Sequence, residues 1–247
     1  MLADAVVTSA VSDELFDKAK ADAKEDNLNF TIKKAHCSKK IQCEGIAAHA
    51  STPEEGVNAA SGLIKLFTEM FGEDAGKMTA FLDKTIGYEY DGASMGVKCS
   101  DKESGPLTLN LGVLDFDDEN DSAVIDIRYP VTCKGSEIFD TINKKAESFG
   151  IEATLISDSK PLFVDENNLL ITKLSHAYKT VTGEQAELYS SGGGTYAREL
   201  SCGVAFGPGT KTLSFYNIHG ANEFLDVEEF MKHCEICLQA MYELGCE

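Results

Sequence analysis

Two apolar segments with alternating polar residues lie on either side of a short acidic run, and no other feature restricts the fold as strongly. The segments read "LTLNLGVLDF" (107–116) and "SAVIDIRYP" (122–130), and the run between them reads "DDEND" (117–121). Alternation with a period of two is typical of strands that bury one face, and a short polar loop can reverse the chain. The sequence therefore predicts an antiparallel β-hairpin.

The register of this hairpin follows from placing its large aliphatic side chains on one face. If Phe116 faces Ser122, then Leu111 pairs with Ile127 and Val113 with Ile125 on the apolar face. Asn110 then lies directly opposite Arg128 on the more polar face, with Cβ atoms about 5 Å apart. The planar guanidinium of Arg128 could bind a carboxylate. The alternative is an ion pair with Asp126, two residues away on the same face.

The rest of the first part of the chain predicts more strands and helices. Thr52, Pro53 and Glu55 form a capping box that marks a helix start at residue 52. The other expected elements are strands at 5–11, twice within 29–50 and at 151–158, and helices at 12–27, 75–86 and 135–148. Ser12 or Asp13 is expected to cap the first of these helices. Residues 1–162 are thus expected to form an α+β domain, an antiparallel sheet with helices on one face.

Residues 163–247 predict an α/β arrangement of alternating helices and strands. Asp226 and Glu229 form a capping box at the start of the last helix, from residue 227. Another helix is expected at 167–182, with strands at 186–190, 203–209 and 213–219. The apolar stripe of the last helix is expected to comprise Phe230, Cys234, Cys237, Leu238, Met241 and Leu244.

The charge balance excludes some classes of partner. The 22 basic and 41 acidic residues give a formal net charge of −19, which repels nucleic acid and anionic membrane surfaces. No apolar run approaches the ~20 residues that span a bilayer, and the first residues lack a basic segment ahead of an apolar one. We expect a soluble, cytoplasmic protein.

Cysteine and histidine offer few obvious metal sites. The eight cysteines are scattered through the chain, so reduced thiols are expected rather than disulfides. Cys234 and Cys237 form a C-x-x-C beside His233, a weak zinc candidate because no second pair stands at a suitable spacing. His219, after an apolar strand, is either a metal ligand or a hydrogen-bonded structural histidine.

Three other features have both a functional and a structural explanation. His49 precedes a capped helix, where its ring could act on a ligand or bond nearby backbone. The glycines of "SGGGTYAR" could let backbone amides approach a ligand, or could form only a permissive turn. The glutamate pairs at 54–55 and 228–229 stand in first helical turns, where capping and the helix dipole explain them, so we reject them as catalysts.

Five motifs occurring in this order resemble those of one enzyme family. They are "GIAAHASTPEEGVNAA", "LTLNLG", "IDIRYP", "SGGGTYAR" and "IHGANE". Together they resemble the zinc-dependent dipeptidases of the aminoacylase and carboxypeptidase clan, and within it the bacterial Xaa-His, carnosinase-like group. The resemblance implies a lid domain inserted between two halves of a catalytic domain with two zinc ions. Residues 1–162 match the lid, and 163–247 match the second catalytic half.

The resemblance also implies roles for individual residues. His49 matches the lid histidine that stabilises the oxyanion, Asn110 an asparagine near the substrate, and Arg128 the arginine that holds the C-terminal carboxylate of a dipeptide. His219 matches a zinc ligand. A substrate-lining turn is matched by Gly192, Gly193, Gly194 and Thr195.

One part of the family pattern is missing from these 247 residues. The family's other metal ligands include a His-x-Asp motif, and none of the five histidines is followed by that pattern. We therefore expect an N-terminal catalytic half to be absent, zinc binding to be weak, and hydrolysis by this chain alone not to occur. The alternative is a non-enzymatic module that binds ligands or self-associates through the lid.

Overall fold

The structure is a computed structural model of the 247-residue chain, and it describes residues 2–8, 11–34, 38–117, 120–207, 216 and 222–246. The chain divides into two compact units, Met1–Ser159 and Lys160–Glu247. In the described residues there are six α-helices and three small antiparallel sheets. None of the described helices combines the length and the apolar character needed to cross a membrane.

The first unit begins with a three-stranded antiparallel sheet in the order β1-β3-β2. Its strands are β1 (Leu2–Thr8), β2 (Asn29–Lys34) and β3 (Ser38–Glu44). Helix α1 (Asp13–Asp22) follows β1, and the hydroxyl of Ser12 accepts a hydrogen bond from the Leu15 N–H at 3.0 Å. The predicted cap is therefore confirmed, although the helix ends at Asp22 rather than residue 27.

The second helix starts later than predicted. Pro53–Glu55 form only one 3₁₀ turn, and α2 (Ala59–Phe71) is capped instead by Asn58, whose Oδ1 accepts from two backbone N–H groups. Backbone hydrogen bonds between Ile46 and Val57, at 2.9 and 3.1 Å, hold the chain extended between the turn and the helix. The predicted start at Thr52 is wrong because this bridge intervenes.

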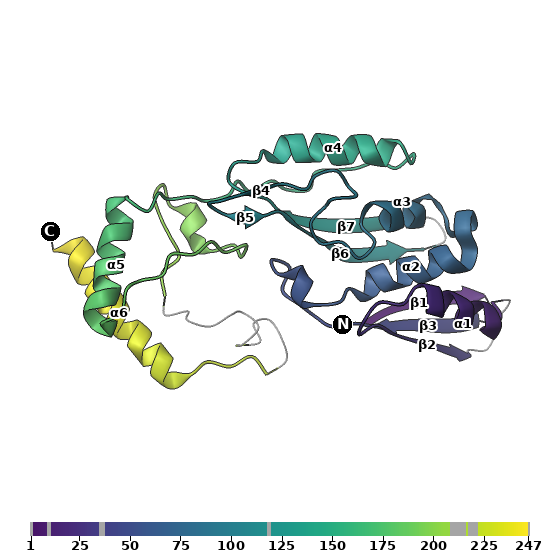
Figure 1. Ribbon diagram of the computed structural model, residues 1–247, viewed down its shortest axis with the longest axis horizontal. Coiled ribbons are helices and arrows are strands. Elements are labelled where there is room, and N and C mark those ends of the chain that lie inside the picture. Colours follow the sequence, from purple (N-terminus) through teal and green to yellow (C-terminus); the bar gives the residue numbers. More distant parts are fainter. Residues whose placement is uncertain are drawn as a thin grey trace. The chain divides into compact units, whose positions relative to one another are not determined.

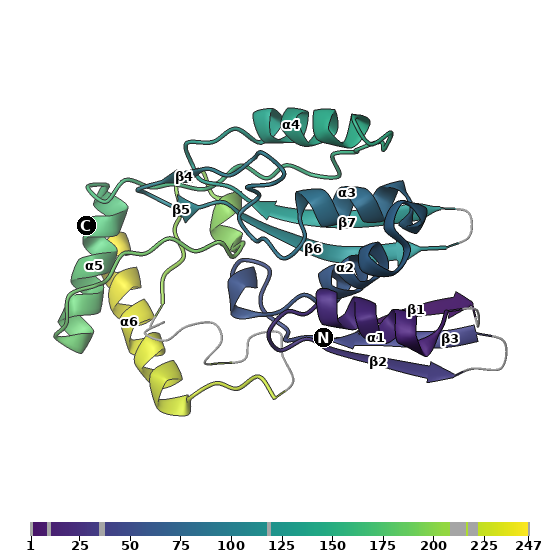
Figure 2. The same cartoon turned by 45° about the vertical axis from the view of Figure 1, so that its right-hand side comes forward.

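Helix α2, which lies between the two sheets in Figure 1, supplies side chains to two separate hydrophobic cores. Leu63 and Leu66 pack in the first core, with α1 and the three-stranded sheet. Ile64 packs in the second, with the hairpin formed by β6 (Thr108–Phe116) and β7 (Asp121–Arg128). Figure 2 likewise shows α2 between the two sheets. One amphipathic helix thus joins the two halves of this unit.

The predicted hairpin forms, but in a different register. Asn110 pairs with Asp126, not Arg128, and Phe116 pairs with Asp121, not Ser122. Two changes add up. Phe116 pairs with Asp121 across a loop one residue shorter than predicted, and a β-bulge between Leu111 and Val113, which leaves Gly112 without a Cα partner, shifts the register by one more residue. A uniform alternation across the hairpin cannot anticipate this extra residue.

The bulge also changes which residues of β6 face the core. Leu109 and Leu111 are buried before it, whereas Leu114 and Phe116 pack against the same core after it. Val113 is 53% exposed, so the predicted pairing of Val113 with Ile125 on the apolar face is wrong. Odd-numbered positions face the core on one side of Gly112 and even-numbered positions on the other.

Further helices and a short sheet complete the second core. These are η2 (Gly72–Ala75), α3 (Lys77–Thr85), β4 (Ser100–Asp101), β5 (Gly105–Pro106) and α4 (Gly135–Glu147). Asp101 accepts hydrogen bonds from the backbone N–H and hydroxyl of both Ser104 and Thr132, tying β4 to the end of β7. Burial alone would raise the pKa of Asp101, but these hydrogen bonds outweigh burial and lower the pKa to about 2.

The strand expected at 151–158 does not form. Ile151 and Ala153 contact the second core, whereas Leu155 and Ile156 are 49% and 76% exposed. A strand needs a hydrogen-bonded neighbour along its length, and this segment is not paired into any sheet of the described residues. The hydroxyl of Tyr129 donates to Asp158 Oδ1 at 2.6 Å and fixes the segment's end.

The second unit is built on two contacting helices, α5 (Leu169–Thr182) and α6 (Val227–Gly245). Asn168 caps α5, and Gly183 ends it in the left-handed conformation at φ 77°. The predicted cap of α6 is confirmed, because Asp226 accepts from the N–H groups of Glu228 and Glu229. A 3₁₀ turn, η3 (Tyr196–Glu199), lies between the two helices in the chain.

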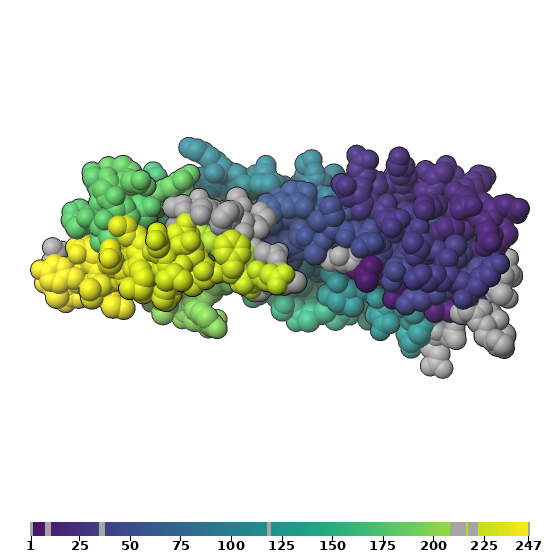
Figure 3. Space-filling view, turned by 90° about the horizontal axis from the view of Figure 1, so that it is seen from below, coloured from purple at the N-terminus to yellow at the C-terminus, as the bar shows by residue number. Residues whose placement is uncertain are grey.

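The apolar stripe predicted for α6 is not the buried face. Ile236 and Ala240 are buried, whereas Leu238 and Met241 are each 71% exposed. Figure 3 shows the side chains of α6 (yellow) along one face of the molecule. The predicted stripe needs a covering layer that the described residues of this unit do not supply.

The α/β pattern expected for the second unit is not seen in its described residues. Residues 186–190 and 203–207 form no strand, and Leu188 and Tyr189 are more than half exposed. These segments bury no continuous apolar face, which is what an interior strand requires. Residues 208–215 and 217–219 of the other expected strands lie outside the described residues.

Candidate functional site

His49 lies in a loop that several contacts hold in place. The Ile46–Val57 bridge closes the loop, and the hydroxyl of Tyr90 donates to the Gly56 carbonyl at 3.1 Å. Burial raises the pKa of Tyr90, so the phenol keeps its proton for this bond. A Cβ on Gly56 would come within 2.7 Å of the Ile46 carbonyl oxygen, so only glycine fits here. The loop is therefore pre-organised around His49.

The ring of His49 is oriented by Ser51. The Ser51 backbone N–H donates to His49 Nδ1 at 3.2 Å, and the Ser51 hydroxyl lies 2.7 Å from the same nitrogen. A backbone N–H can only donate, so Nδ1 is an acceptor and the proton of the neutral ring is on Nε2. The structural role expected for His49, bonding to nearby backbone, is thus filled by Nδ1. This bond leaves the N–H donor, Nε2, on the other side of the ring.

Arg128 forms the ion pair with Asp126 that the sequence offered as the alternative to carboxylate binding. Its Nε donates to Asp126 Oδ1 at 2.6 Å and its terminal nitrogen donates to Oδ2 at 3.1 Å. This two-point contact fixes the plane of the guanidinium. The side chains of Arg128 and Asp126 are 30% and 41% exposed, so the pair is open to solvent.

Asn110 lies on the same polar face of the hairpin as Arg128. The observed register places Thr108 opposite Arg128 and Asn110 opposite Asp126, so Asn110 and Arg128 are diagonal neighbours. Diagonal positions across a ladder are about 7 Å apart, which long side chains can span. The face therefore presents an amide and a guanidinium, as predicted, but not as a directly opposed pair.

Two residues beside these candidates were missed by the sequence reasoning. Ser51 orients His49, and Asn58 donates from Nδ2 to Asn110 Oδ1 at 3.3 Å. Both could have been recognised from the sequence, since Ser51 is two residues after the histidine and Asn58 directly precedes the apolar run of α2. An asparagine before such a run is a strong N-cap signal, stronger than the threonine at position 52.

The glycine-rich segment, residues 192–195, belongs to the second unit, whereas the hairpin belongs to the first. The Gly193 N–H donates to the Ser191 hydroxyl at 3.1 Å, and a Cβ on Gly194 would lie 3.6 Å from the Arg198 guanidinium. Gly192, Gly193 and Gly194 all avoid positive φ angles, so backbone conformation does not by itself demand glycine. Thr195 directly precedes η3.

The expected metal ligand, His219, is not among the described residues. His219 falls in residues 217–221, outside the described part of the chain. Cys237 Sγ lies 3.5 Å from His233 Nε2, but Cys234 is exposed. Among the described residues, no three or more His, Cys, Asp or Glu side chains converge to hold a metal ion. These residues alone do not fit a zinc centre.

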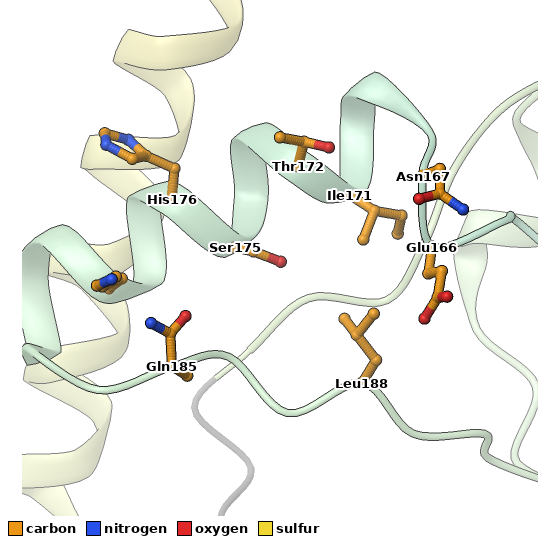
Figure 4. Close-up of a pocket in the computed structure, with 9 residues that line it drawn as sticks. Glu166, Asn167, Ile171, Thr172, Ser175, His176, Gln185 and Leu188 are labelled. Atoms are coloured by element: carbon orange, nitrogen blue, oxygen red, sulfur yellow. The ribbon is translucent and has the colours of Figure 1, made fainter.

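A groove of about 400 Å³ lies along α5 in the second unit (Figure 4). It is lined by Glu166, Asn167, Ile171, Thr172, Ser175, His176, Lys179, Gln185 and Leu188. None of the site residues predicted from the sequence is among them. The groove is therefore a separate feature of the second unit.

Comparisons with a family model and with individual proteins both match this chain to peptidases. Residues 34–243 match the family model described as "Peptidase family M20/M25/M40". "Putative dipeptidase YtjP" of Bacillus subtilis (strain 168) is 32% identical over 254 residues, covering 98% of this chain and 52% of that protein. "Putative dipeptidase SH1171" of Staphylococcus haemolyticus is 32% identical over 209 residues, covering 84% and 44%. The chain spans about half the length of these relatives.

Proposed function

This chain belongs to the peptidase family M20/M25/M40, and from that premise we propose that it is part of a hydrolase acting on dipeptides with a free C-terminal carboxylate. The names of its relatives support a dipeptide as the substrate. The observation that carries the proposal is the polar face of the β6–β7 hairpin, where Asn110 and Arg128 lie diagonally across one ladder. Both side chains can donate hydrogen bonds to a carboxylate.

In this proposal Arg128 holds the substrate carboxylate and Asp126 sets the plane of the guanidinium. Two nitrogen atoms of the guanidinium donate to the two carboxylate oxygens of Asp126, and this contact fixes the guanidinium plane. Because the pair is partly exposed, a peptide carboxylate reaches it without first being buried. The recognition depends on the negative charge of the peptide terminus, so an amidated dipeptide binds less tightly.

His49 supplies the donor for the oxyanion that forms at the scissile carbonyl. With Nδ1 held by Ser51, the neutral ring donates from Nε2. A single well-placed donor of this kind stabilises a transition state by about 3 kcal/mol. The bridge and the tight packing at Gly56 keep the loop from rearranging when substrate binds.

The remaining family roles are part of the same proposal. Met1–Ser159 would act as the lid, Gly192–Thr195 would line the substrate, and His219 would bind metal. Members of this family are generally zinc-dependent, but the described residues do not form a metal site. A preference for Xaa-His dipeptides is the expected specificity.

Calorimetric titration with alanyl-histidine and its C-terminal amide tests the proposal. We expect the acid to bind the chain and the amide to bind about tenfold more weakly, since a hydrogen bond to a charged group contributes ~1.5 kcal/mol. Arg128→Gln should abolish this difference. Lys98→Gln, which removes an exposed cation paired with Asp91 in the same unit, should preserve it. Equal binding of acid and amide by the unaltered chain would contradict the proposal.

A further inference from the structure

Asn58 uses each of its polar atoms within the fold. Its Oδ1 accepts from the backbone N–H groups of Ala60 at 2.9 Å and Ser61 at 3.2 Å. Its Nδ2 donates to the Leu111 carbonyl at 2.8 Å and to Asn110 Oδ1 at 3.3 Å. The residue is only 8% exposed. A buried amide with both acceptor sites and both donors engaged is held in one orientation.

The backbone partners determine which way this amide faces. Ala60 and Ser61 offer N–H groups that can only donate, and Leu111 offers a carbonyl that can only accept. Rotating the Asn58 amide by 180° would set donors against donors and leave buried groups unpaired, which is costly. Asn58 therefore presents a donor to Asn110.

The orientation of Asn58 in turn determines that of Asn110. A donor from Asn58 requires Oδ1, the acceptor end of the Asn110 amide, to face it. The two N–H groups of Asn110 are consequently directed away from Asn58. Asn110 Nδ2 lies 3.7 Å from where a Cβ of Gly112 would stand. The hairpin face that carries Asn110 also carries its diagonal neighbour Arg128 and its direct partner Asp126, both from β7.

We propose that Asn58 is a positioning residue, which fixes the Asn110 amide so that its N–H groups are presented to a hydrogen-bond acceptor of the substrate. This inference rests on the proposed function, in which Asn110 contacts a peptide. A free amide could turn either end toward the ligand, and the oxygen end would repel a carboxylate or carbonyl oxygen. Asn58 removes that unfavourable half of the rotamers before the substrate arrives.

A double-mutant cycle separates positioning from a purely structural role. Asn58→Asp keeps the acceptor that caps α2 but replaces the donor to both Asn110 and the Leu111 carbonyl with a carboxylate oxygen, which favours the reversed Asn110 amide. The lost bond to Leu111 is the same in both backgrounds of the cycle. We expect it to weaken alanyl-histidine binding about fivefold in the unaltered chain and not at all in the Asn110→Ala background. Equal weakening in both backgrounds, or unaltered binding by Asn58→Asp, would overturn the proposal. Circular dichroism confirms that each variant is folded.

Side-chain amide exchange in the unaltered chain tests the orientation without any variant. The Nδ2 protons of Asn58 should exchange slowly with solvent, because they are buried and bonded, and those of Asn110 should exchange faster. The opposite order would mean that the Asn110 amide faces the other way and would overturn the inference. If the expected order holds but Asn110→Ala leaves dipeptide binding unchanged, the positioning role falls because the proposed substrate contact is wrong, not because the orientation is.

Discussion

Truncating α2 on either of its two faces should destabilise both sheets of the first unit. Leu66 is fully buried in the first core and Ile64 is 2% exposed in the second. Replacing either with Ala removes three buried carbon groups at ~0.8 kcal/mol each, and the cavity left behind adds to this cost. We expect Leu66→Ala and Ile64→Ala each to lower the free energy of unfolding by about 3 kcal/mol.

Native-state hydrogen exchange reads this effect separately in the two sheets. The amide of Ile41 reports on β3, the central strand of the first sheet, and the amide of Leu109 in β6 is bonded to the Tyr90 carbonyl at 2.7 Å. If α2 couples the two cores, each variant lowers protection at both amides by a factor on the order of 100. The reason is that the unit unfolds as one cooperative body.

The matched control is Leu155→Ala, which makes the same chemical change at a position 49% exposed. Its cost should stay within about 0.5 kcal/mol because little apolar surface leaves the core. A Leu66→Ala variant that loses protection at Ile41 while Leu109 is unaffected would refute the reasoning. The two sheets would then be independent, and the loop that holds His49 would not be supported by both cores.

Three further outcomes are expected. Because the fold lowers the pKa of Asp101 to about 2, its stabilising contribution is complete above about pH 4 and is lost as pH falls toward 2. Urea unfolding of Asp101→Asn should therefore show lower stability than the unaltered chain at pH 7 and equal stability near pH 2. Asp126→Asn should tighten binding of the dipeptide acid, measured by calorimetry, because a competing anion beside Arg128 is removed. Because Leu238 and Met241 of α6 are exposed and apolar, the chain should self-associate with rising concentration in sedimentation velocity, and Leu238→Lys combined with Met241→Lys should abolish this.

Features set by local chemistry were predictable from the sequence. The caps at Ser12 and Asp226 formed as expected because a side-chain oxygen beside free N–H groups needs no distant partner. The hairpin was predictable because alternation across a short loop is also a local pattern. At Thr52 the same rule failed, because pairing between Ile46 and Val57 delayed the helix to Asn58, a better cap.

Features that depend on partners were not predictable in the same way. The loop is one residue shorter than predicted and the bulge at Gly112 shifts the register by one more residue, so Asp126 replaces Arg128 as the partner of Asn110. Alternation alone does not reveal an inserted residue, although a glycine within a strand is a known warning of one. The segments at 151–158 and 186–190 have strand-like composition but pair with no neighbour among the described residues, and composition does not supply one.

The central claim is that the polar face of the β6–β7 hairpin holds a dipeptide by its carboxylate, and a side-chain NMR titration tests it most directly. Alanyl-histidine is added to ¹⁵N-labelled chain while the Arg128 Nε and Asn110 Nδ2 signals are followed, and the titration is repeated with the C-terminal amide. We predict that both signals shift with the acid and remain nearly unchanged with the amide. Shifts confined to residues of the α5 groove, such as Gln185, or identical responses to acid and amide, would contradict it.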